Sequence, residues 1–133
     1  MMTASWGGLG YLWDKPVCFV FVRSQRYTYP LLEKHTCFTL TFFEERHREA
    51  LNFCGSHSGR DVNKVAATGL TPVVGATGAV YFAEARLTLE CRKLYAQDLT
   101  AESFIDPSII TDTYRAGDFH RMYIGEIVHA WRQ

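Results

Sequence analysis

Long apolar runs of the kind that form β-strands constrain the fold of this chain more than any other feature. Val17–Arg23 (VCFVFVR) and Thr36–Phe43 (TCFTLTFF) are rich in β-branched and aromatic residues, which favour buried strands. Phe119–Trp131 is a longer run, apolar on both faces, as expected for a strand inside a barrel or at a subunit interface. There is no regular alternation of strands with long helices. We therefore expect a mainly β fold, a small barrel with short peripheral helices, rather than a doubly wound sheet.

A further strand is predicted by strict alternation. From Ala83 to Arg92, small or apolar residues alternate with charged or polar ones. This period of two predicts a strand with one buried face and one solvent-exposed face. The alternating charges on the second face indicate solvation, with a dimer contact as the alternative.

Four short helical or irregular segments are predicted between the strands. Their ranges are Tyr27–Lys34, Glu44–Cys54, a short helix beginning at Asp61, and a connection over Phe104–Ile110. Thr28 and Asp61 are the predicted N-caps, and Gly55 and Gly69 the predicted C-terminal glycines.

The composition of the chain narrows the classes of function that the protein can have. The chain has 133 residues, which we interpret as one domain over 1–133, and 14 basic and 14 acidic side chains cancel. A basic excess, typical of nucleic-acid binding, is lacking. No apolar run is long enough for a membrane span and no signal peptide is recognisable, so we expect a cytoplasmic protein. The four cysteines are scattered and predicted to be buried thiols in a reducing compartment, and the histidines have no metal-ligand spacing.

Polar segments at the boundaries of the apolar runs are the candidate sites. Thr3–Gly8 combines hydroxyls and glycine backbone with an indole, which suits a flat heteroaromatic ring. The alternative is a glycine turn with a core tryptophan. Gly8 and Gly10 do not make a dinucleotide fingerprint, because Trp13 stands where the third glycine would be.

The second segment, Arg23–Thr28, ends a strand and begins a helix. Two guanidiniums and the hydroxyls of Ser24 and Thr28 form a candidate phosphate cradle, since charged donors near free helical N–H groups bind anions. A solvated turn with a helix cap is the alternative.

Two further segments complete the set. Ser58–Lys64 is another loop that enters a helix, and Gly117–His120 leads into the last strand. A single histidine on a strand is commonly structural, so His120 keeps that alternative on the residues alone.

In this order the four segments resemble the flavin reductase-like, FMN-binding split-barrel family and its flavoredoxin-type branch. The resemblance implies a split β-barrel that holds FMN near the boundary of a homodimer. It places His120 near the flavin and the nicotinamide, as the candidate catalytic residue. The implied cofactor contacts are Thr3, Ala4, Ser5, Trp6, Arg23, Ser24, Arg26, Tyr27, Thr28, Ser58 and Lys64. Relatives carry a further strand region before the segment that begins at Thr3, so we expect this chain to lack it.

The function implied by the resemblance is transfer of hydride or electrons from NAD(P)H to flavin by an NAD(P)H-dependent flavin oxidoreductase. One alternative is a non-enzymatic FMN-binding electron carrier that exchanges electrons with a redox protein partner. The other is a flavin-free interaction barrel. No metal ligands are predicted.

Overall fold

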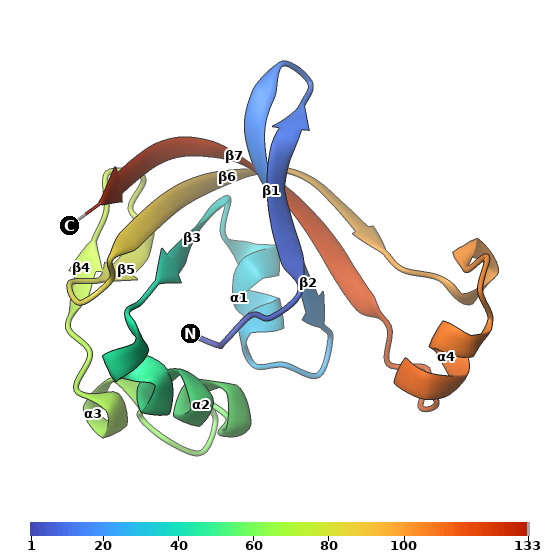
Figure 1. Cartoon of the computed structure of the whole chain (residues 1–133), viewed down its shortest axis with the longest axis horizontal. Helices are drawn as coiled ribbons and strands as arrows, with labels where there is room; N and C mark the ends of the chain where they lie inside the picture. The colour runs from blue at the N-terminus through green and yellow to red at the C-terminus, as the bar shows by residue number, and fades with distance from the viewer. Residues whose placement is uncertain (133) are drawn as a thin grey trace.

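The computed structural model describes residues 1–132, and Gln133, the last residue of the predicted domain, lies outside them. Seven antiparallel strands and short helices make up the described residues (Figure 1). The strands are β1 (Gly7–Leu12), β2 (Lys15–Arg23), β3 (Cys37–Phe42), β4 (Pro72–Val74), β5 (Val80–Phe82), β6 (Leu87–Asp98) and β7 (His120–Arg132). The α-helices are α1 (Thr28–Lys34), α2 (Arg48–Ser56), α3 (Lys64–Thr68) and α4 (Ser108–Thr113), with 3₁₀ turns at Glu45–His47 and Ala101–Ser103.

A five-stranded sheet in the order β1–β2–β7–β6–β3 forms the body of the fold, and β4 and β5 form a separate hairpin. The long strands β6 and β7 sweep across the whole molecule, with α2 and α3 at one side and α4 at the other (Figure 1). The predicted mainly β split-barrel with short peripheral helices is confirmed. The predicted strands at β2, β3 and β7 are confirmed within two residues at each end.

The strand predicted over Ala83–Arg92 begins later, at Leu87, and its solvent-exposed face is wrong. Thr88 and Glu90 are buried although they fall on the predicted exposed side. The reason is the loop between β4 and β5, which lies over that side: the Glu90 carboxylate accepts hydrogen bonds from the backbone N–H groups of Ala76 (2.9 Å) and Thr77 (2.7 Å). A carboxylate satisfied by backbone donors can occupy a buried position.

The hairpin of β1 and β2 is a feature that the sequence does not predict. β1 contains three glycines and is almost entirely exposed, so it carries no apolar alternation. Trp13 and Asp14 form the turn with φ of 54° and 56°, the left-handed geometry of two-residue hairpin turns. The hairpin projects from the body of the molecule (Figure 1).

The helix boundaries correct three of the four predicted caps. α1 has Tyr27 as its N-cap without a side-chain hydrogen bond, so Thr28 is not the cap. Gly55 lies inside α2, which ends at Ser56 before an extended residue. Asn63, not Asp61, caps α3 by accepting from the N–H of Ala66, because Asp61 belongs to a turn in which its N–H donates to the Ser58 carbonyl before the helix begins. Gly69 ends α3 at φ 69°, as predicted.

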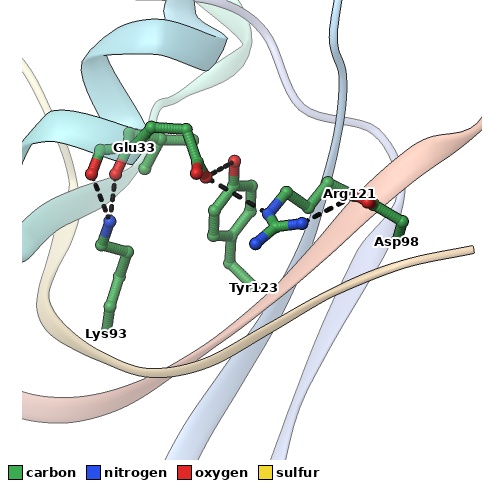
Figure 2. A network of polar contacts seen from close by, with 6 residues as sticks. Glu33, Lys93, Asp98, Arg121 and Tyr123 are labelled. Atoms are coloured by element: carbon green, nitrogen blue, oxygen red, sulfur yellow. Dashed lines mark hydrogen bonds and ion pairs between the residues drawn. The ribbon is translucent and has the colours of Figure 1, made fainter.

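The C-terminal end of α1 is held by side chains from β6 and β7 (Figure 2). Tyr123, fully buried, donates its hydroxyl to Glu33 Oε1 at 2.6 Å, and Arg121 Nε lies 3.2 Å from the same oxygen. Lys93 donates to the backbone carbonyls of Leu32 and Glu33. Cations on the last carbonyls of a helix stabilise that end. This network fixes α1 and, with it, the segment before α1.

The cysteines are free thiols, as predicted, and three are buried; Cys37 is partly exposed. Cys18 on β2 and Cys91 on β6 bring their sulfur atoms to 3.4 Å across β7. Gly125 of β7 lies between these two strands, and a Cβ there would come within 2.9 Å of the Phe38 ring. The glycine therefore lets side chains of three strands meet in the core.

Candidate functional site

An open cavity of about 280 Å³ lies where the N-terminal segment crosses the ends of β2 and β7. Its size is near the lower end of the range of small-molecule pockets, about 300 Å³. It brings together residues from three of the four sequence segments. Its lining residues are Met2, Thr3, Ala4, Ser5, Trp6, Phe21, Arg23, Arg26 and His120.

Trp6 and His120 form an aromatic pair at the edge of this cavity. Their ring centroids are 4.7 Å apart with planes tilted by 44°, and Trp6 remains 50% exposed. His120 is the first residue of β7 and lies opposite Arg23 of β2 in the sheet register. A half-exposed indole beside an imidazole offers a flat apolar surface to a planar ring.

Tyr114, which follows α4, supports His120 from the side of the protein interior. Its hydroxyl lies 2.7 Å from His120 Nδ1, and the two rings meet edge to face with centroids 5.6 Å apart. Burial, with the positive charge of Arg23 as a second cause, lowers the pKa of His120 below its usual value. His120 is therefore neutral at pH 7.

Arg23 faces the cavity but its guanidinium is already engaged. Nη1 lies 2.5 Å from the Asp118 carboxylate and Nη2 donates to the carbonyl of Thr113 at 3.3 Å. The guanidinium also lies over the Tyr114 ring, 5.6 Å from its centroid. Gln25 donates to the same Asp118 oxygen at 2.9 Å. Arg23 thus ties the end of β2 to the start of β7, beside His120.

Arg26 is the less committed of the two guanidiniums. Among the described residues its side chain has one hydrogen-bond acceptor, the carbonyl of Gly55, at 3.3 Å. Since a guanidinium carries five N–H donors, most of them remain available to an anion. Arg26 is exposed and lines the cavity.

The loop over residues 57–61 packs against the phosphate-cradle segment. Arg60 donates to the carbonyl of Gln25 at 3.2 Å and lies over the Tyr27 ring at 5.1 Å. A Cβ on Gly59 would approach the Tyr27 ring to 2.9 Å, so this position needs a glycine or a shifted ring. Tyr27 is therefore used in joining the two loops.

Four of the sequence-predicted residues do not line the cavity. Ser24 and Tyr27 lie between β2 and α1, Thr28 is the first residue of α1, and Ser58 lies in the loop that packs against that segment. Lys64 does not line the cavity either, and it is buried. It donates to the carbonyls of Cys54 (2.6 Å) and Met1 (3.3 Å), and burial lowers its pKa. Lys64 thus holds the N-terminal segment against the end of α2. The cofactor contacts of all eleven predicted residues, including the six that line the cavity, remain predictions, as does the catalytic role of His120.

The N-terminal segment is anchored to α2 by Thr3. Its hydroxyl donates to the carbonyl of Leu51, and a Cβ on Gly55 would meet Thr3 at 3.4 Å. Ser5 is exposed and, of the residues described, none forms a hydrogen bond with its hydroxyl. The segment therefore offers the Ser5 hydroxyl, but not that of Thr3, to a bound molecule.

Sequence reasoning does not single out Phe21 and Tyr114, and it assigns no role to Asp118. Phe21 has a detectable signal, because it lies two positions before Arg23 and shares its face of the strand. Asp118 belongs to the quoted Gly117–His120 segment, and its pairing with Arg23 becomes visible only in the fold. Tyr114 has no sequence signal, since it comes from the connection after α4.

Within residues 1–132, no group of histidine, cysteine, aspartate and glutamate side chains is arranged to hold a metal ion. No helix in that range is long and apolar enough to cross a membrane.

Comparison with known families decides the classification. Residues 2–133 match the family described as flavin reductase like domain. The chain belongs to this family. Among curated proteins, no sequence matches the chain.

Solved structures share the fold of this flavin reductase-like chain. An FMN-binding protein from Thermus thermophilus, crystallised with p-hydroxybenzaldehyde, is 27% identical with a TM-score of 0.74, over 98% of this chain and 62% of that one. Flavoredoxin of Desulfovibrio vulgaris is 24% identical with a TM-score of 0.77, over 99% and 61%. An NADH:FAD oxidoreductase from Streptomyces globisporus is 20% identical with a TM-score of 0.73, over 99% and 67%. The chain thus spans about three fifths of the length of the first two structures.

The donor set of the cavity fits a flavin mononucleotide. The half-exposed Trp6 indole and the His120 imidazole suit a planar heteroaromatic ring, and Arg26 has free donors for a phosphate. A neutral histidine, an exposed serine and main-chain groups match the carbonyl and nitrogen atoms of an isoalloxazine. Arg23 fits less well as a phosphate ligand, because Asp118 already neutralises it.

Proposed function

We propose that this flavin reductase-like protein binds FMN in the Trp6–His120 cavity and passes hydride or electrons from NAD(P)H to it. The observation that carries the proposal is the combination, in one open cavity, of an aromatic pair with a largely uncommitted guanidinium. An aromatic surface next to an anion site matches a molecule with a flat ring at one end and a phosphate at the other.

The residues of the chain would divide the work of binding. Arg26 binds the phosphate, together with the hydroxyls of Ser24 and Ser58. Ser24 is exposed, whereas Ser58 is half-buried and accepts from the backbone N–H of Arg60. Trp6 contributes apolar surface to the ring, and His120 donates a hydrogen bond to a carbonyl of the ring or of the nicotinamide. A bound flavin supplies the hydride and electron chemistry itself, so the protein needs mainly to align the reactants at about 3–3.5 Å.

No proton-transfer residue is needed for this proposal. His120 is neutral and hydrogen-bonded to Tyr114, and Arg23 is paired with Asp118. Neither pair is arranged as a nucleophile with its base, which is consistent with chemistry carried by the cofactor. His120 is then a catalytic residue in the sense that it contacts the reacting rings.

FMN titration followed by quenching of flavin fluorescence tests the binding step. Arg26→Ala is expected to raise the Kd for FMN about 10-fold to 100-fold, since a charge-assisted hydrogen bond contributes about 1.5–3 kcal/mol. Arg46→Ala is the matched control, because Arg46 is exposed outside the cavity and pairs with Glu44 at 3.5 Å. No saturable FMN binding by the unmodified chain would overturn the proposal.

A second experiment separates the reductase from an electron carrier. The open cavity and the exposed Trp6 also leave room for a protein donor to approach the ring. Anaerobic bleaching of bound FMN by NADH or NADPH supports the reductase. Bleaching only by a ferredoxin-type donor supports the carrier, and unbleached FMN with both donors contradicts both.

We further propose that two copies of the chain associate through the β1–β2 hairpin. Leu9, Tyr11 and Trp13 are exposed on it, and Trp13 lies 6.1 Å from the ring of Tyr95 on β6. Contiguous exposed apolar side chains are typical of protein interfaces. Sedimentation equilibrium is expected to show a dimer that Tyr11→Lys weakens, whereas a monomer at all concentrations would contradict this association.

A further inference from the structure

The contact between Tyr114 and His120 determines more than the position of the imidazole ring. Tyr114 is only 4% exposed, and among the described residues His120 Nδ1, at 2.7 Å, is the hydrogen-bond acceptor within reach of its hydroxyl. A buried hydroxyl proton without an acceptor is costly. The phenol therefore donates to Nδ1, and Nδ1 carries a lone pair rather than a proton.

We propose that Tyr114 is a positioning residue that keeps the proton of neutral His120 on Nε2, so that the cavity meets an uncharged N–H donor. In a neutral imidazole one nitrogen donates and the other accepts, and the partner of one nitrogen sets the state of the other. A carboxylate partner would have the opposite effect. It would hold a proton on Nδ1 and leave Nε2 as a base.

Within residues 1–132, the carboxylate near His120 is that of Asp118, and it is not available for that opposite arrangement. Asp118 lies two residues before His120, but its Oδ2 accepts from Arg23 at 2.5 Å and from Gln25 at 2.9 Å. Arg23 thus keeps the carboxylate away from the imidazole and leaves the phenol as its partner.

Charges around the ring also oppose a second proton on His120. Arg23 on β2 and Arg26 in the following loop both disfavour the imidazolium, and Asp118 favours it only in part. Protonation of Nδ1 would in addition force the buried phenol to give up its acceptor. Burial and these charges together lower the pKa of His120, in agreement with the geometry.

This inference rests on the proposed function for its chemical meaning. An uncharged N–H donor suits a carbonyl oxygen, such as those of a flavin ring or a nicotinamide carboxamide, and not a phosphate. The anion is then left to Arg26. The two ends of a flavin mononucleotide would be recognised by two different kinds of donor.

The test measures the ring nitrogens of the FMN-free protein by long-range ¹H–¹⁵N correlation after ¹⁵N-histidine labelling. His120→Gln assigns the signal among the five histidines. We expect Nδ1 to have the shift of an unprotonated nitrogen and Nε2 that of a protonated one. A protonated Nδ1 in the neutral, unmodified protein would overturn the proposal without need of any variant.

Tyr114→Phe keeps the ring that packs on Phe104 and Phe119 and removes only the hydroxyl. We expect the two nitrogens to average toward a mixture of tautomers, and the pKa of His120 to rise toward the ordinary value of about 6.5. Tyr11→Phe, on the exposed hairpin, is the control and should change neither. Unchanged nitrogen shifts and unchanged titration in Tyr114→Phe would refute the role of Tyr114.

A measurement of the reaction rate distinguishes failure of this proposal from failure of the proposed function. With NADH as donor, Tyr114→Phe should show a new loss of rate on the acidic side of neutrality, where its His120 begins to titrate. If the unmodified protein oxidises no NADH and binds no FMN, the proposed function fails, while the nitrogen shifts still decide whether Tyr114 fixes the tautomer.

Discussion

Two tyrosine hydroxyls close to the start of β7 make hydrogen bonds of nearly equal length in opposite surroundings. The buried Tyr123 donates at 2.6 Å to Glu33 at the end of α1, where Arg121 pairs with the same carboxylate and Lys93 donates to the Glu33 carbonyl (Figure 2). Tyr114 lies 2.7 Å from His120, whose other side opens into the cavity. A tyrosine hydroxyl thus holds the end of α1 at one place and contacts a residue of the candidate binding cavity at the other. The difference lies in the partner: Glu33 is a carboxylate already paired with Arg121, whereas His120 lines the cavity.

The largest effect is expected from removing the core tyrosine. Tyr123→Ala should lower the free energy of unfolding by about 3–5 kcal/mol, because it leaves a cavity in the core and removes the partner of Glu33. That is a large part of the about 5–15 kcal/mol of a typical domain. Urea denaturation measures the loss, with the exposed Tyr11→Ala as control at under about 0.5 kcal/mol. A loss below about 1 kcal/mol would show that the Tyr123–Glu33 network does not stabilise the fold.

Removing only the hydroxyls sharpens the comparison. Tyr123→Phe should cost about 1.5 kcal/mol of stability, since it removes a hydrogen bond to a charged group. It should leave the tautomer of His120 unchanged, because the two networks share no residue. If Tyr123→Phe moves the His120 nitrogen shifts as Tyr114→Phe does, the two regions are coupled and the comparison fails.

The two regions should also lose stability at opposite ends of the pH range. Burial, with the hydrogen bond to Glu33, raises the pKa of Tyr123. Above pH of about 10 the unfolded chain loses this phenol proton while the folded protein keeps it, so stability falls as pH rises. The lowered pKa of His120 acts in the other direction. Below pH of about 6.5 the unfolded chain binds more protons, so stability falls as pH decreases.

Denaturation at several pH values, repeated on two variants, checks this expectation. Tyr123→Phe should flatten the alkaline part of the stability curve, and His120→Gln should flatten the part between neutral and mildly acidic pH. Each variant should leave the other part as it is. A variant that alters both parts equally would point to a general loss of structure.

The smallest effect is expected at the outer edge of the core network. Asp98 pairs with Arg121 at 2.9 Å, but its side chain is 63% exposed. Asp98→Asn should therefore change the free energy of unfolding by about 0.5 kcal/mol, and less at high salt. A loss as large as that of Tyr123→Phe would mean that Asp98 orients Arg121 for the whole network.

The strands that pack on both faces could be predicted from the sequence, and the exposed ones could not. β2 and β7 are largely apolar, and residues on both faces of each strand are buried or half-buried over much of its length. β1 lies at the sheet edge with glycines and exposed aromatics, so it has no pattern to detect. The prediction of a solvent-exposed face on β6 was wrong for a different reason. The charged residue Glu90 of this strand is buried by backbone donors from another hairpin, which no local pattern reveals.

The candidate site shows the same limit. The segments that contain Trp6, Arg26 and His120 could be chosen from their residue types, and the fold brings them into one cavity. What the sequence could not give is how each side chain is already engaged. Arg23 looks like a free cation in the sequence, and its pairing with Asp118 arises only because β2 and β7 are neighbours.

The buried carboxylate of Glu90 has a consequence for the order in which the chain becomes structured. It holds the turn of the β4–β5 hairpin through the amides of Ala76 and Thr77, although β6 comes later in the sequence. That turn gains its lasting order only once β6 has been laid down beside it. In the folded protein these two turn amides should exchange their hydrogens as slowly as amides of a central strand. This surface loop would then open only when the core strand β6 unfolds.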